Sequence, residues 1–225
     1  TEYLEAVEFD PEAVEQVVIN LENAGLYVEI ARTIAPSLGE SSLTPRSHLV
    51  VGLANRYLGR TDQAKTHFQA YIDGMPDKAV AGVRVAYELI SGGFEADALP
   101  YAKRAIEKAP ARPTGYFYRG VSLLARGEVE RAERDIQRGI GAGVDRGLGH
   151  YFVLRTALQV GADELAHEAL RGLFQHSTQF PGSEASRRHI TQSHAVSAVR
   201  RAGDTKVPIE FLTREYPDLA SGRGI

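Results

Sequence analysis

Glycine recurs along this chain at a fixed spacing of 34 residues, and this period limits the possible folds more than any other feature. The glycines are Gly25, Gly59, Gly93, Gly127 and Gly161. Three further columns keep the same step: Ala64, Ala98, Ala132 and Ala166; Ile72, Ile106, Ile140 and Phe174; and the small residues Gly52, Ala86 and Gly120. Several independent columns at one period indicate tandem copies of a single unit that stack into a solenoid.

Each copy is predicted to be a pair of helices. Glycine suits the positive φ that ends the first helix, and alanine early in the second helix lets the two backbones approach closely. Pro76 and Pro110 keep the 34-residue step and would stop the second helix. The chain has no sustained period-two alternation and no Asn-Gly or Asp-Gly hairpin between β-branched residues, so strands are not expected. The predicted fold class is all-α.

Local signals predict where several helices begin. The pairs Asp10-Pro11 and Thr44-Pro45 each read as an N-cap followed by proline at the first helical position. Thr61 or Asp62 is expected to cap the helix after Gly59. Pro100 falls inside a predicted helix and is placed in its first turn, where a missing N–H matters little.

The order of these columns within one unit, small residue, glycine, alanine, isoleucine and proline, resembles the tetratricopeptide repeat family, whose unit is a 34-residue helix-turn-helix. The resemblance implies a right-handed α-solenoid with four repeats at 45–78, 79–112, 113–146 and 147–180. Residues 1–44 are predicted to form a divergent N-terminal helical repeat or cap, with helices to about Ala24 and over Leu26 to Ala35. Residues 181–225 are predicted to form C-terminal capping helices, Glu184 to Arg201 and Val207 to Tyr216, and a tail. Arg119 occupies a usually apolar column and should find a carboxylate or carbonyl partner.

The same resemblance implies a binding surface, because the first helices of this family line a concave groove. The residues carried onto that groove are Leu49, Leu53, Arg56, Tyr57, Val83, Tyr87, Ile90, Phe117, Val121, Tyr151 and Arg155. An apolar and aromatic groove favours an amphipathic helix or an extended segment of a partner protein, with Arg56 and Arg155 orienting its acidic groups. Replacing Phe117 and Tyr151 by alanine is then expected to abolish binding and to leave helicity intact.

Two alternatives to groove binding stay open. Phe117 or Tyr151 could pack the inner wall, or a terminal segment of this chain could fill the groove, because apolar stripes at helical spacing are often core. The family's carboxylate clamp is disfavoured, since Leu49, Leu53 and Val83 stand where its polar side chains would be needed.

Composition excludes several function classes. The chain has 225 residues and no cysteine, and the lack of cysteine excludes disulfides and thiolate zinc sites. Its net charge of −3 argues against nucleic-acid binding. It shows no membrane-spanning run and no signal segment. We expect a soluble protein without membrane insertion, with the cytoplasm favoured over the periplasm. Because the chain starts at Thr1, it is expected to be processed or excised from a longer protein.

Charge is distributed unevenly along the chain. The eight acids before the first base, Arg32, are Glu2, Glu5, Glu8, Asp10, Glu12, Glu15, Glu22 and Glu29, and the other end carries Arg187, Arg188, Arg200, Arg201 and Lys206. Such runs usually mark solvated end helices. The alternative is that the two ends meet partners, or meet each other head to tail in a homo-oligomer.

Signals for catalysis, metals and cofactors are weak. His189 and His194 are five residues apart, which does not align them on one helix face, and His167-Glu168 lacks the second histidine of a metalloprotease motif. The glycines between 139 and 143 follow no predicted strand and precede no Gly-Lys-Ser or Gly-Lys-Thr. No Gly-x-Ser-x-Gly motif is present. We therefore expect no enzyme activity, metal or cofactor.

The predicted function is a non-catalytic scaffold or adaptor that binds a segment of another protein. One alternative is the repeat domain of a larger enzyme or envelope-assembly protein whose chemistry lies outside this chain. Another is a structural protein that assembles through its oppositely charged ends, which salt would weaken.

Overall fold

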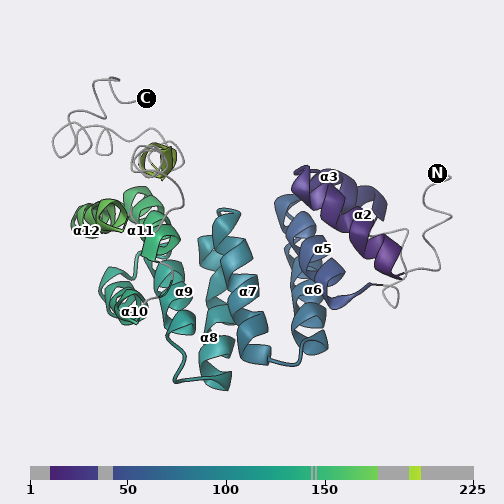
Figure 1. Ribbon diagram of the computed structural model, residues 1–225, viewed down its shortest axis with the longest axis horizontal. Helices are drawn as coiled ribbons and strands as arrows, with labels where there is room; N and C mark the ends of the chain where they lie inside the picture. Colours follow the sequence, from purple (N-terminus) through teal and green to yellow (C-terminus); the bar gives the residue numbers. More distant parts are fainter. Residues whose placement is uncertain (1–10, 35–42, 143, 145, 177–192, 199–225) are drawn as a thin grey trace. The chain divides into compact units, whose positions relative to one another are not determined.

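The computed structural model describes residues 11–34, 43–142, 144, 146–176 and 193–198, and all regular structure in these ranges is helical (Figure 1). The predicted all-α helical-repeat fold is thereby confirmed. The chain divides within α7 into two compact units, residues 1–88 and 89–225. No helix in the described ranges is long and apolar enough to cross a membrane.

The described residues of unit 1, 11–34 and 43–88, form six helical segments. They are α2 (Pro11–Asn23), α3 (Tyr27–Glu29), the π-helix η1 (Ile30–Ile34), α5 (Pro45–Tyr57), α6 (Thr61–Gly74) and most of α7 (Lys78–Ser91). The second helix expected over about Leu26 to Ala35 is present, as one α-helical turn that passes directly into the π-helix. This π-helix buries two successive residues, Ile30 and Ala31, in a core with α2 and α5.

Unit 2 begins at the end of α7. It continues through the 3-10 helix η3 (Glu95–Ala98), α8 (Leu99–Lys108), α9 (Pro113–Leu124), α10 (Val129–Gly141), α11 (Arg146–Val160), α12 (Asp163–Gln175) and a short helix at 193–198. Within it α9 packs along α10, and α11 packs along α12. The predicted helix Val207 to Tyr216 lies outside the described residues, as does most of the one predicted from Glu184 to Arg201. The predicted boundaries of the four repeats stay predictions.

The periodic glycines have the conformation that their spacing predicts. All five have φ between 70° and 86°. After each glycine, the next residue donates its N–H to the carbonyl five positions back, as Arg60 does to Asn55 at 2.9 Å. This bond is the Schellman closure of a helix C-terminus, which needs a left-handed residue just before its donor. The glycines therefore end the first helix of each pair.

The small-residue columns keep the paired helices close together. The four alanines of the period are at most 1% exposed. A Cβ added at Gly120 on α9 would lie 2.9 Å from the Ala132 carbonyl oxygen on α10. In the isoleucine column Ile72 is fully buried, whereas Ile140 is only half-buried.

Most of the local predictions for single residues are confirmed. The Thr44 hydroxyl accepts a hydrogen bond from the Ser47 N–H at 3.2 Å, and Pro100 lies in the first turn of α8. Arg119 meets a carboxylate, with Nε and Nη2 donating to Asp135 at 2.6 and 2.8 Å. The prediction that Thr61 or Asp62 caps α6 is wrong, because α6 starts at Thr61 itself and its N-cap residue makes no side-chain bond.

Candidate functional site

Burial separates the eleven residues predicted to line a groove into two groups. Seven are buried: Leu49, Leu53, Ile90, Phe117, Val121, Tyr151 and Arg155. The four others are half-buried or exposed: Arg56, Tyr57, Val83 and Tyr87. All four of these accessible residues belong to unit 1, whereas every predicted residue of unit 2 is buried. A buried side chain cannot contact a partner without rearrangement of its neighbours, so the accessible four are the stronger candidates.

In unit 2 the predicted aromatic residues form part of the wall between helices. Phe117 is 1% exposed, and Cβ atoms added at Gly139 and Gly149 would lie 2.4 and 3.2 Å from its side chain. Tyr151 packs edge-on against His194 of the 193–198 helix, with ring centroids 5.3 Å apart. These contacts favour the alternative in which Phe117 packs the inner wall and a later segment of the chain covers Tyr151. Alanine at either position would therefore remove packing contacts inside unit 2.

Arg155 is buried and has hydrogen-bond partners within its own chain. It is 1% exposed, and its Nη2 donates hydrogen bonds to the Glu95 carboxylate and to the Ile90 carbonyl. Its guanidinium also lies 5.4 Å from the Phe152 ring centroid. A carboxylate sixty residues earlier therefore supplies the acidic group that sequence analysis assigned to a partner.

In unit 1 two accessible tyrosines are held by specific neighbours. Tyr57 is 42% exposed and stacks on Tyr27, with ring centroids 4.6 Å apart. Arg84 lies over the Tyr87 ring at 5.4 Å. We call Arg56, Tyr57, Val83, Arg84 and Tyr87 the unit 1 face. Aromatic rings held in place lose little conformational freedom on binding, which suits them to act as anchors.

A charged cluster beside these residues was not predicted from sequence. Arg84 pairs with Glu88 at 2.5 Å within α7, and Arg46 on α5 approaches Glu22 on α2 at 3.6 Å. Burial raises the pKa of Glu88, and the charge on Arg84 partly opposes this shift. Burial, together with the nearby Tyr57 and the carboxylates Glu22 and Glu88, raises the pKa of Tyr27 to about 12.

A sequence signal existed for only part of that cluster. The spacing of Arg84 and Glu88 is that of an ion pair along one helix face. The approach of Glu22 to Arg46 joins two helices that carry no shared pattern, so nothing in the sequence paired them.

The histidines were weak metal candidates in the sequence. Among the described residues no group of three or more potential ligands comes together. The Nδ1 atoms of His48 and His67 lie 3.0 Å apart, at hydrogen-bond distance. His167 contacts the Asp163 carbonyl oxygen at 2.9 Å, and His189 lies outside the described residues.

Comparison with known proteins supports the fold and leaves the role open. No known protein family and no curated protein matches the chain. Its structure is similar to the crystal structure of PilW, described as a widely conserved type IV pilus biogenesis factor, with a TM-score of 0.51 and 17% identity over 94% of this chain and 96% of that one. It also matches Pseudomonas aeruginosa PilF, with a TM-score of 0.47 and 13% identity over 94% and 95% of the two chains. The likeness to PilW shows a tetratricopeptide-like helical-repeat fold.

Proposed function

We propose that this chain is a non-catalytic scaffold that binds a segment of another protein on the unit 1 face. The supporting observation is that this face holds every predicted groove residue that remains accessible. Tyr57 and Tyr87 serve as aromatic anchors, Val83 adds apolar contact, and Arg56 and Arg84 interact with acidic or carbonyl groups of the bound segment. Buried aromatic and arginine residues provide much of the binding energy in protein interfaces.

The buried residues of the predicted groove have a supporting role in this proposal. Leu49 and Leu53 are 6% and 3% exposed and lie in α5, which carries Arg56 and Tyr57. They hold the helix that presents the anchors. In this proposal only accessible side chains contact the partner.

A peptide-display experiment tests this proposal. The wild-type chain is panned against a random-peptide library, and selected peptides are titrated by fluorescence anisotropy against the Tyr57→Ala/Tyr87→Ala variant. Loss of an anchor typically costs about 2 kcal/mol, so we expect the variant to bind at least roughly thirtyfold more weakly.

Val80→Ala is the matched control, because Val80 is also on α7 and is 48% exposed but lies outside the unit 1 face. It should bind the selected peptides as the wild type does. Failure to select any peptide, or equal affinity for the double variant and the wild type, would contradict the proposal. Circular dichroism would show that both variants remain helical.

A further inference from the structure

A cavity of about 150 Å³ opens between the second helices of two successive helix pairs in unit 2. Its inner walls come from three helices and are buried: Ile136 on α10, His150 and Val153 on α11, and Leu165 and Ala169 on α12. Gln137, Ile140 and Glu168 complete the lining and are more accessible. A cavity of this size lined by apolar side chains can hold a benzene ring.

The cavity exists because neighbouring pairs are loosely joined at this point. Contacts between α10 and α11 are sparse, whereas α8 packs closely along α9. Ile140 stands in the same column of the repeat as the fully buried Ile72, but it is half-buried and lines the cavity. The interior of a stacked repeat is therefore left with an unfilled apolar space.

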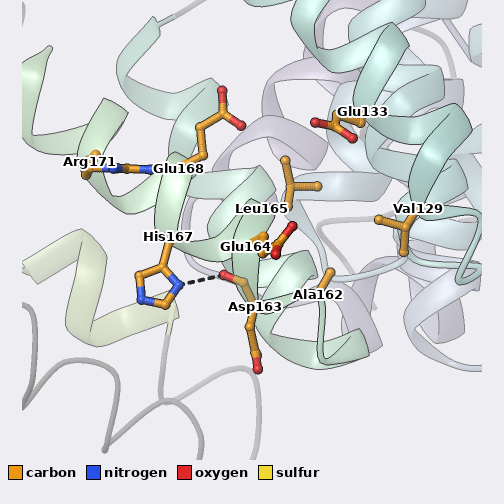
Figure 2. Close-up of a pocket in the computed structure, with 9 residues that line it drawn as sticks. All are labelled: Val129, Glu133, Ala162, Asp163, Glu164, Leu165, His167, Glu168 and Arg171. Atoms are coloured by element: carbon orange, nitrogen blue, oxygen red, sulfur yellow. Dashed lines mark hydrogen bonds between the residues drawn. The ribbon is translucent and has the colours of Figure 1, made fainter.

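Beside the cavity a wider hollow carries acidic side chains. Figure 2 shows Val129 and Glu133 from α10 on one side and residues 162–171 on the other. The charged side chains that line it are Glu133, Asp163, Glu164, Glu168 and Arg171. Leu165 and Glu168 line both spaces, so the hollow and the cavity are direct neighbours. Four carboxylates against one arginine favour a positively charged occupant.

One wall residue has unused hydrogen-bonding capacity. His150 is 7% exposed, and neither of its ring nitrogens has a hydrogen-bond partner among the described residues. Buried polar groups without partners are rare in folded proteins and call for a ligand, water or other explanation. Burial and the nearby His176 lower the pKa of His150 to about 4, so this ring is uncharged at neutral pH and does not repel a cationic segment.

We propose that this cavity and hollow, which we call the α10–α12 furrow, form a second docking site that takes one aromatic side chain of a partner segment flanked by lysine or arginine. The ring enters the 150 Å³ cavity, and the flanking cations lie along Glu133, Glu164 and Glu168. The furrow lies in unit 2 and shares no residue with the unit 1 face. Either site can therefore fail without the other.

Short peptides of opposite flanking charge test the proposal by NMR titration of the ¹⁵N-labelled chain. We expect acetyl-Lys-Tyr-Lys-amide to shift amide signals of α10, α11 and α12. Acetyl-Glu-Tyr-Glu-amide and acetyl-Lys-Ala-Lys-amide should bind at least tenfold more weakly. Shifts of equal size with the acidic peptide, shifts spread over the whole chain, or no shifts at all would overturn it.

Two variants separate the cavity from the charges. Ala169→Leu places a larger side chain in the cavity and should weaken binding at least tenfold. Glu133→Lys should weaken it severalfold, while Glu130→Lys is a charge-matched control on the same helix at an exposed position outside the furrow. If Ala169→Leu does not fold, Glu133→Lys and Glu130→Lys still decide the outcome, because equal affinities for these two would contradict the proposal.

Other occupants give distinct results. Signals of the furrow that change with protein concentration in the absence of peptide would show that a second copy fills it. Unchanged peptide binding by the Ala169→Leu variant would show that the ring binds elsewhere. Either result overturns the proposal.

Discussion

Single glycines determine how closely helices approach in this protein. At Gly120 an added Cβ would lie 2.9 Å from both the Ala132 carbonyl oxygen and the Ile136 backbone nitrogen. Backbone atoms cannot move aside as a flexible side chain can, so α9 and α10 would have to separate. At Gly141, the last residue of α10, an added Cβ would meet nothing within 4 Å.

Gly120→Ala is therefore expected to destabilise the fold by about 1–3 kcal/mol through overpacking. Gly141→Ala should be neutral or should stabilise by up to about 1 kcal/mol, because alanine is the better helix former. Urea unfolding followed by circular dichroism measures both. Equal stability of the two variants would show that the helices can separate at no cost.

At the scale of elements, one buried ion pair joins parts of unit 2 that are distant in the chain. Arg155 on α11 contacts Glu95 on η3 and the Ile90 carbonyl at the end of α7. The two side chains are 1% and 6% exposed, and within the part of the chain that the structure describes Nε and Nη1 of Arg155 have no hydrogen-bond partner. A buried pair with unsatisfied donors stabilises little by itself, but removing one partner leaves an uncompensated charge.

We therefore expect Arg155→Met to destabilise the fold by about 3–5 kcal/mol. Adding Glu95→Leu in the same chain should restore much of that loss, because two apolar side chains then replace the pair. A double-mutant cycle by urea unfolding measures the coupling. Strictly additive effects would mean that the contact contributes nothing specific.

At the scale of the whole molecule, stability should depend on pH through His150. Its pKa falls from 6.5 to about 4 on folding, because burial disfavours the imidazolium ion. Between these values the unfolded chain binds more protons than the folded chain, so stability falls as the pH drops from about 6.5 toward 4. Above pH 6.5 this histidine contributes no pH dependence.

The stability difference between wild type and His150→Leu should therefore change by on the order of 2 kcal/mol between pH 7 and pH 4, allowing for solvent near the ring. The wild type should lose more stability than the variant over that range. Unfolding titrations at several pH values measure it. Parallel pH curves would show that the ring protonates in the folded state without cost.

Much of the fold was predictable because its signals are local. The role of each glycine at the 34-residue interval depends only on the positive φ at that residue. The Thr44 cap and the position of Pro100 depend only on the helix to which each belongs. The candidate site was less predictable. Repeat position assigned Arg155 and Phe117 to an open groove, yet both are 1% exposed. The furrow between α10 and α12 had no sequence signal, because it results from loose packing between neighbours.

Sequence alone therefore determined the helical-repeat class, the points where helices end and the small residues that bring paired helices together. These follow from backbone conformation and side-chain size at single positions. Tertiary structure decided which side chains remain accessible, because burial depends on residues far away in the chain. The Glu95 carboxylate pairs with the buried guanidinium of Arg155, while the Tyr57 side chain remains 42% exposed. Because only the predicted groove residues of unit 1 are accessible, the proposed binding surface is the unit 1 face. The α10–α12 furrow in unit 2 is likewise visible only in the tertiary structure.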